Sequence, residues 1–263
     1  MAAPQRVAVL IDCDNISHQL CSAIFEETAQ HGTLGIKRAY GDWASDNLSG
    51  WRAKLPIHAL QPIQQFAYTV RKNATDSALI IDAMDLLYSG NVDVFCLVSS
   101  DSDFTRLAMR LRESGKTVYG IGAKTTPKAF QNACDRFTYT EVLGEGMVTL
   151  EPGSTSVVTS VKRAHDLDVP TVKSVITPAV TATARDDGWA HLGAVGHHVV
   201  NQHPSFDSRN YGFPKLGLLV RKQSFLEVKD VPLENGMTQV WVRLRAAGQP
   251  AKKSTKKAAA TRR

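Results

Sequence analysis

The sequence predicts an α/β fold, with a parallel sheet flanked by helices, followed by a small helical module with a β-hairpin and then a basic tail. Residues 1–145 alternate short β-branched runs with amphipathic stretches, as strands joined by helical crossovers do. A stretch rich in Gly, Ser, Thr and Pro follows, and beyond it a helical pattern ends in two strand-like runs around an Asn-Gly pair. With 263 residues the chain can form two packed cores.

In the first part of the chain, apolar runs are assigned by their period and length. Short runs rich in β-branched residues predict strands at residues 7–11, 34–40, 57–60, 94–99, 118–121 and 137–139. Amphipathic periodicity predicts helices at residues 17–30, 49–54, 77–88, 104–114 and 127–133. Gly32, Gly90 and Gly115 follow periodic segments, so we expect them to end helices in a left-handed conformation.

The second part of the chain follows a different pattern. Its periodicity predicts helices from about residue 171 and at residues 191–201 and 214–222, then strands at 225–228 and 240–244. The strands flank Glu234-Asn235-Gly236, whose Asn-Gly pair is a strong hairpin signal. Three helices and a β-hairpin make a winged helix. We therefore expect a first domain, a linker, a winged-helix domain and a disordered basic tail, at residues 1–145, 146–165, 166–247 and 248–263.

Charge is distributed unevenly along the chain. The net charge is +6, and the last segment alone supplies six cations and no acid: Lys252, Lys253, Lys256, Lys257, Arg262 and Arg263. The rest of the chain therefore has no net charge. Because the tail lacks an apolar anchor, we expect it to be disordered and to hold RNA phosphates without sequence preference.

The composition excludes several classes of protein. Hydrophobic residues make up 43% and charged residues 21%, which is ordinary for a folded globular chain. No apolar run reaches the roughly 18 residues that span a bilayer, and the start lacks the apolar stretch of a signal peptide. We therefore expect a cytoplasmic protein without a membrane partner. The four cysteines form no CxxC pair and lie in apolar segments, which predicts reduced, buried thiols.

Acidic residues follow two of the predicted strands directly. Asp12 and Asp14 come after one apolar run, and Asp101 and Asp103 come after another. In open α/β sheets the crevice beyond the carboxyl ends of the strands binds ligands, so neighbouring strands would bring both pairs to one cleft. Asp76 precedes a predicted helix and can point the same way. These positions predict an acidic cleft.

Clustered carboxylates need a counter-charge. Two unit charges about 4 Å apart repel by roughly 4 kcal/mol at an effective dielectric of 20. All-oxygen ligation favours Mg²⁺ or Mn²⁺, and such an ion supports phosphodiester hydrolysis. A simpler interpretation also exists, because Asp14, Asp76 and Asp103 are residues that can cap the helices after them, and Asn15 can be a turn residue whose amide steadies Asp12.

Four segments together resemble the NYN domain, a relative of the PIN nucleases: LIDCDN (10–15), KNATDSALIIDAMDLL (72–87), LVSSDSDFTRLAMRLRESG (97–115) and TPKAFQNACDRF (126–137). The resemblance covers nearly all of residues 5–143. It implies a PIN-like sheet in which Asp12, Asp76, Asp101 and Asp103 bind metal and are catalytic. It implies supporting positions at Asn15, Asp82 and Ser100.

Residues 189–228 resemble the OST-HTH (LOTUS) domain, above all in the phrase FDSRNYGFPKLGLLV. Members of that family bind RNA, some preferring G-rich or folded RNA, and some animal members bind a helicase. A helix with several cations and a nearby tyrosine offers phosphate contacts and a stacking ring. The predicted RNA-binding residues of this domain are Arg209, Tyr211, Lys215, Arg221 and Lys222.

Together these observations predict a ribonuclease that needs Mg²⁺ or Mn²⁺ and cleaves single-stranded or structured RNA, with the winged helix and the tail docking the substrate. A non-catalytic RNA-binding regulator or scaffold is the alternative. Aspartyl-phosphate phosphatases also begin with a strand and DxD, but they need Thr or Val where Ile16 stands. A homodimer or a helicase partner stays open.

Overall fold

The computed structural model describes residues 4–65, 74–144, 170–232 and 238–245. The chain divides into two compact units, one containing residues 1–169 and 200–210, the other residues 170–199 and 211–263. Within the described ranges, no helix combines the length and the apolar character that crossing a bilayer requires. The predicted linker and the tail lysines Lys252, Lys253, Lys256 and Lys257 lie outside the described residues.

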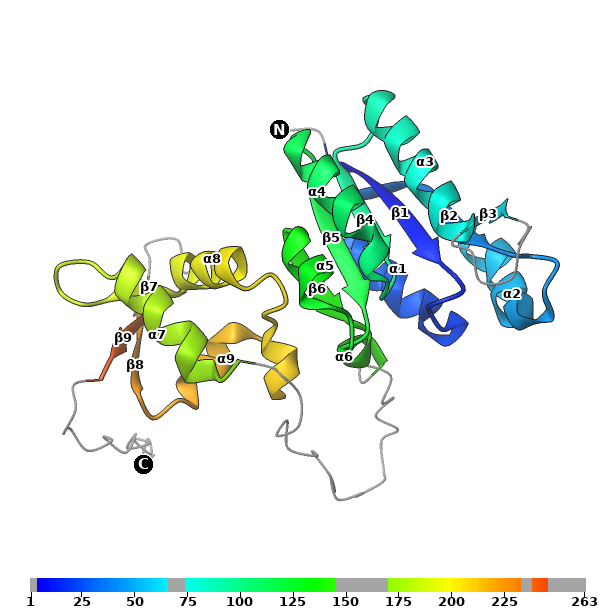
Figure 1. Ribbon diagram of the computed structural model, residues 1–263. Helices are drawn as coiled ribbons and strands as arrows, with labels where there is room; N and C mark the ends of the chain where they lie inside the picture. Colours follow the sequence, from blue (N-terminus) through cyan, green and yellow to red (C-terminus); the bar gives the residue numbers. More distant parts are fainter. Residues whose placement is uncertain (1–3, 66–73, 145–169, 233–237, 246–263) are drawn as a thin grey trace, which may run out of the picture. The chain divides into compact units, whose positions relative to one another are not determined.

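The first unit is built on a six-stranded sheet in the order β3-β2-β1-β4-β5-β6, and every strand pair is parallel (Figure 1). The strands are β1 Arg6–Asp12, β2 Thr33–Gly41, β3 Gln61–Gln64, β4 Val94–Val98, β5 Thr117–Gly122 and β6 Arg136–Tyr139. The central strands β1 and β4 are buried along almost their whole length, as strands covered on both faces must be. The predicted parallel α/β sheet is confirmed.

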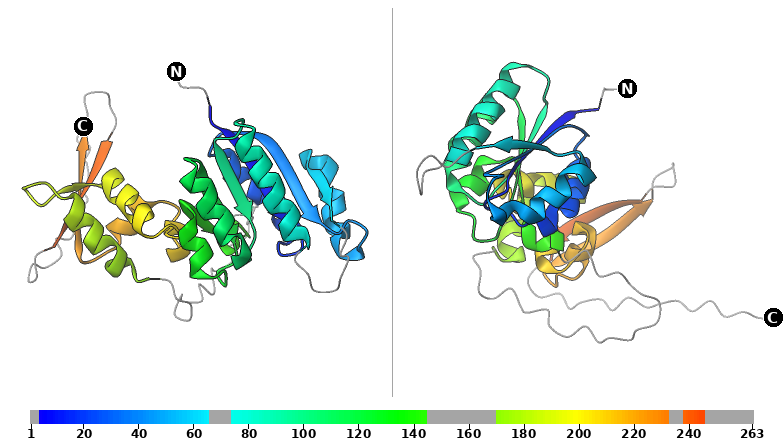
Figure 2. Two further views of the ribbon diagram at one scale, coloured as in Figure 1. Left: turned by 45° about the horizontal axis from the view of Figure 1, so that its top comes forward. Right: turned by 90° about the vertical axis from the view of Figure 1, so that its right-hand side faces the viewer.

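Two layers of helices cover the sheet (Figures 1 and 2). One layer contains α3 Ala74–Tyr88, α4 Thr105–Glu113 and α5 Lys128–Ala133. The other contains α1 Cys21–Ala29, α2 Ser49–His58 and α6 Thr140–Gly144. Alternate residues of β1 enter the two cores, with Ala8 and Leu10 in the first and Val9 and Ile11 in the second. All four cysteines are free and buried, as predicted.

One predicted strand is wrong. Residues 57–60 end a helix, because α2 continues through Pro56 to His58, and the strand β3 begins only at Gln61. Ala59 ends the helix in the left-handed conformation at φ 48°, a place where Gly is the usual signal. A short apolar run bounded by no glycine does not distinguish helix from strand.

Other differences concern helix ends. The stretch expected to be one helix at residues 17–30 begins with the 3-10 turn η1 His18–Leu20, which leads into α1. The 3-10 turn η3 Ser102–Phe104 leads into α4 in the same way. A third, η2 Asp46–Leu48, precedes α2. Gly90 and Gly115 follow α3 and α4 with φ of 69° and 76°, as predicted. The helix α6 was not predicted.

The second part of the chain forms helices and a small antiparallel sheet. The helices are α7 Val172–Thr183, α8 Leu192–Gln202 and α9 Leu216–Arg221, with the 3-10 turn η5 Ser208–Tyr211 before α9. The sheet has the order β7-β9-β8, from β7 Ala190–His191, β9 Thr238–Leu244 and β8 Leu226–Pro232. Three helices and the β8–β9 pair confirm the winged-helix prediction, while β7 was not predicted and residues 234–236 lie outside the described residues.

Candidate metal centre

The site lies at the carboxyl ends of β1 and β4. These adjacent strands are where the strand order reverses direction, since β2 and β3 follow on one side and β5 and β6 on the other. Such a switch point opens a crevice beyond the strand ends. The pairing of Ile11 with Val98 brings Asp12, the last residue of β1, next to Ser99. Topology therefore brings the two acidic segments together.

Asp12 is buried and held on both carboxylate oxygens. Its Oδ2 accepts from Asn15 Nδ2 at 2.6 Å and Ser99 Oγ at 2.7 Å, and its Oδ1 accepts from the Asp14 backbone N–H at 3.2 Å. Its side chain is only 1% exposed. Burial raises the pKa of Asp12, and the hydrogen bonds from Asn15 and Ser99 oppose that rise. The expected support of Asp12 by Asn15 is thus present.

Three further carboxylates converge beside it. Oxygen atoms of Asp76, Asp101 and Asp103 all lie within 4.8 Å of one another. Asp76 stands in the first turn of α3, and Asp101 precedes η3, where its Oδ1 accepts from the Asp103 backbone N–H at 2.9 Å. Asp101 is partly buried and Asp103 is exposed. The three side chains therefore offer oxygens beyond the carboxyl ends of β1 and β4.

The pKa of Asp76 reflects the density of negative charge at this site. Burial raises the pKa of Asp76 to about 6, and the negative charges of Asp12, Asp101, Asp103 and Asp14 add to the rise. Five carboxylates therefore act on one small region. A divalent cation fits this group, because it neutralises repulsion that otherwise favours protonation, and because oxygen donors suit Mg²⁺ or Mn²⁺.

Residues 6–143, more than half of the chain, match the family model of the NYN domain. The chain belongs to the NYN domain family. Residues 168–238 match the OST-HTH/LOTUS domain, so a LOTUS domain follows the NYN domain. An uncharacterized protein of Methanocaldococcus jannaschii is 30% identical over 136 residues, which make up 49% of this chain and 53% of that protein. This chain thus spans about half the length of that curated relative.

Solved structures resemble parts of the chain. A Vibrio parahaemolyticus protein of unknown function is 18% identical with a TM-score of 0.44, covering 53% of this chain and 94% of that one. A Chromobacterium violaceum protein fragment is 37% identical with a TM-score of 0.26, covering 31% and 87%. An uncharacterized Nitrosomonas europaea protein is 21% identical with a TM-score of 0.29, covering 39% and 100%. At these TM-scores the similarities assign neither a fold nor a function to this chain.

Helix capping explains the position of Asp101 but not those of Asp14 and Asp103. Ser17, rather than Asp14, accepts the capping hydrogen bond of η1. Asp14 is exposed and accepts from Thr75 Oγ1 at 3.0 Å. Asp101, rather than Asp103, caps η3, and it uses only Oδ1 for that bond. Asp103 is therefore not explained by a capping role.

Ser99 is a site residue that the sequence analysis missed. Its hydroxyl donates to Asp12 and accepts from the Asp101 backbone N–H at 3.1 Å, so it links the two acidic segments. Gly122 at the end of β5 lies so close that an added Cβ would be 2.5 Å from the Ser99 carbonyl oxygen. A serine among the three of the SSDS segment has no sequence signal that sets it apart.

Two predicted supporting residues have other partners. Asp82 Oδ2 accepts from Arg38 and from the Tyr40 hydroxyl, both at 2.9 Å, and so ties α3 to β2. Burial and the Asp82 charge raise the pKa of Tyr40. Ser100 Oγ accepts from the Ala123 backbone N–H at 2.9 Å and ties the loop after β4 to the end of β5. These contacts are structural, and Asp82 lies outside the group of three converging carboxylates.

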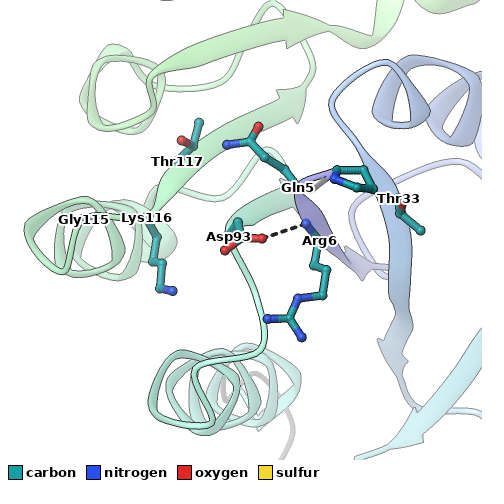
Figure 3. A pocket seen from close by; sticks show the side chains of 8 residues that line it. Gln5, Arg6, Thr33, Asp93, Gly115, Lys116 and Thr117 are labelled. Carbon is teal, nitrogen blue, oxygen red and sulfur yellow. Dashed lines mark hydrogen bonds between the residues drawn. The ribbon is translucent and has the colours of Figure 1, made fainter. Parts of the chain in front are cut away.

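A hollow lies at the amino ends of the strands and is not part of this site. Figure 3 shows it lined by Arg6, Thr33, Asp93 and Thr117, which begin or precede strands, and by the nearby Lys116. In a parallel sheet these amino ends lie opposite the carboxyl ends, where Asp12 and Asp101 stand. Asp93 accepts there from the Arg6 backbone N–H at 2.8 Å.

The predicted RNA-binding residues are partly engaged within the protein. Arg209, which belongs to the first unit, forms ion pairs with Asp207 at 2.7 Å and Glu27 at 2.9 Å. Arg221 pairs with Asp230 at 2.5 Å, and the Tyr211 hydroxyl donates to the Pro170 carbonyl at 2.8 Å. The remaining two, Lys215 and Lys222, are exposed.

The raised pKa of Asp76 predicts a specific pH dependence. Because the folded-state pKa of about 6 exceeds the ordinary value of 3.8, the folded form binds the proton more tightly, so the stability of the metal-free protein falls as pH rises from about 4 to about 6. Thermal melts in EDTA at several pH values measure this fall. We expect Asp76→Asn to reduce it, and an equal slope in both proteins would contradict the assignment.

Proposed function

We propose that this protein is a ribonuclease that hydrolyses RNA phosphodiester bonds with Mg²⁺ or Mn²⁺ held by its NYN domain. The observation that carries this proposal is the convergence of Asp76, Asp101 and Asp103 beside the buried Asp12. Membership of the NYN family, whose relatives include the PIN nucleases, supports it. Without a bound cation, the repulsion among these carboxylates lowers the stability of the folded protein. Such destabilising clusters are typical of functional sites.

The role that we propose for each acidic residue follows from its exposure to solvent. Asp103 and the free oxygen of Asp101 stand at the open side, where they would hold the ion together with Asp76. Asp12, which lies outside this group of three, is buried beside it and is oriented by hydrogen bonds from Asn15 and Ser99. When bound, a divalent cation activates water at neutral pH and stabilises charge on the phosphoryl oxygens. The backbone N–H groups that open α3 lie at the same place, which favours anionic groups there.

We propose that the LOTUS domain and the basic tail dock the RNA. Lys215 and Lys222 are exposed cations of the LOTUS domain that can reach phosphates. The six tail cations would add a log-affinity slope against log salt of up to about −4 on single strands. Docking of this kind holds substrate near the NYN domain without choosing its sequence.

The test is cleavage of a labelled RNA by the purified full chain in Mn²⁺, Mg²⁺ or EDTA. We expect cleavage with either metal and none in EDTA, with activity restored by excess Mn²⁺. RNA that is bound but intact under every metal condition would contradict hydrolysis and favour the RNA-binding regulator. Cleavage that persists in EDTA would show that the acidic centre is not responsible.

A further inference from the structure

The small sheet of the second unit has one buried side and one aromatic, cationic side. Val242 in β9 is paired with Ala190 and Val228, and both Val242 and Ala190 are fully buried. Helices α7 and α9 pack on this sheet (Figure 2). Side chains of a strand alternate between faces, so the next register row, Trp241 with its partners, lies on the opposite face.

That opposite face carries Trp241 at its centre, paired across the strands with Lys229 in β8 and His191 in β7. All three side chains are partly exposed. The His191 and Trp241 rings meet edge to face with centroids 5.5 Å apart. Trp189, just before β7, joins them as a second partly exposed indole. We call Trp189, Trp241, Lys229, Arg185 and Arg243 the wing platform.

Cations and indole rings alternate across the wing platform. Arg185 lies 4.4 Å from the Trp241 ring centroid, and Lys229 lies 5.9 Å from it. Lys229 also lies 4.1 Å from the Trp189 centroid, and Arg243 lies 4.8 Å from that ring. The order is therefore Arg185, Trp241, Lys229, Trp189, Arg243. Each ring has two cations around it.

The cations of the wing platform are only partly neutralised. Arg243 pairs with Glu227 at 2.6 Å. Arg185 and Lys229 form no ion pair with any carboxylate among the residues that the structure describes. Two acids, Asp186 and Asp187, lie in the adjacent turn, and Asp187 accepts from the Trp189 backbone N–H at 3.1 Å. Two cations held by aromatic rings thus stay available to an anionic ligand.

We infer that the wing platform binds unpaired bases of single-stranded RNA, which deepens the proposed function and rests on its RNA substrate. The rings and the guanidinium of Arg185 provide flat surfaces for bases, and Lys229 can move from between the indoles to a phosphate. Duplex RNA keeps its bases stacked inside the helix, so it would gain only the phosphate contacts. The ligand is therefore single-stranded.

The experiment is fluorescence anisotropy of a labelled single-stranded RNA of about 12 nucleotides with the full chain in EDTA, where no metal-dependent cleavage occurs. Base–aromatic stacking loss predicts about tenfold weaker binding for Trp241→Leu, with Trp241→Phe staying within about threefold of wild type. Arg185 lies outside the sheet, so Arg185→Ala leaves the strand pairing intact. We expect this substitution to weaken binding about threefold and to reduce the slope of log affinity against log salt by about 0.7. Arg110→Ala removes a matched exposed cation from α4 and should change nothing.

Three results would overturn the inference. If Trp241→Leu and Arg185→Ala bind single strands like wild type while Lys222→Ala weakens binding, RNA docks on the helices and the proposed function stands without the wing platform. If Trp241→Leu weakens duplex and single-stranded RNA equally, stacking is absent. If the wild-type chain binds no RNA, both ideas fail. If the wild-type chain binds RNA but does not cleave it with Mg²⁺ or Mn²⁺, only the nuclease proposal is contradicted.

Discussion

Asp101→Asn is expected to lower metal-dependent RNA cleavage on the order of a thousandfold, as losses of single catalytic groups commonly do. The amide keeps the shape of the side chain and retains an oxygen that can accept from the Asp103 backbone N–H, so η3 should stay capped. It removes one of three converging negative charges. The measurement is the single-turnover cleavage rate of a labelled RNA in Mn²⁺, together with a thermal melt.

A matched control exists on the neighbouring helix. Asp85 is an exposed acid of α3, so Asp85→Asn makes the same chemical change away from the three converging carboxylates. We expect it to cleave like wild type. Metal-free Asp101→Asn should be at least as stable as wild type, because repulsion on Asp76 is relieved. Full cleavage by Asp101→Asn would remove Asp101 from the proposed centre.

Arg209→Ala is expected to destabilise the first unit by about 3–5 kcal/mol, because it leaves the buried Glu27 carboxylate without its cation and Asp207 with only its weaker ion pair to Arg136. Glu27 and Asp207 are 5% and 7% exposed, and Arg209 donates to both of them. Burial acts to raise the pKa of Asp207, but the hydrogen bonds from Arg209, together with the positive charges of Arg209 and Arg136, leave the pKa lowered. This stabilisation is therefore present above pH 4 and is lost as pH falls through the lowered pKa.

Thermal melts at pH 7 measure the effect, and a loss of roughly 10 °C is expected for a unit of this size. Adding Glu27→Gln to Arg209→Ala removes one stranded charge and should restore part of the stability. An Arg209→Ala protein that melts like wild type yet binds RNA weakly would contradict this structural role and restore the predicted RNA contact. Weak RNA binding by an unstable Arg209→Ala protein would not identify an RNA contact.

The part of the site that follows from sheet topology could be predicted from the sequence. Asp12 and Asp101 follow continuous apolar runs, and such runs are typical of central parallel strands whose ends meet. Asp82 could not be placed by motif alone. It lies six residues after Asp76 on one helix, about 240° around the axis, so the two side chains leave α3 in different directions.

Contacts between distant segments were beyond sequence reasoning. Arg209 and Glu27 are 182 positions apart, and no local pattern announces their ion pair. The wing platform depends on the pairing of His191 and Lys229 with Trp241, and a shift of one residue would turn Trp241 to the buried face. Ser99 likewise acquires its role only because β1 and β4 are adjacent.

The position of the acids at the carboxyl ends of β1 and β4 has a consequence for biosynthesis. These acids come from separate stretches of chain, and they meet only after Val94–Val98 has paired with Arg6–Asp12. A nascent polypeptide that has not yet emerged as far as Asp101 lacks two of the three converging carboxylates. A nuclease assembled this way would be inert toward the messenger being translated until its own sheet is complete.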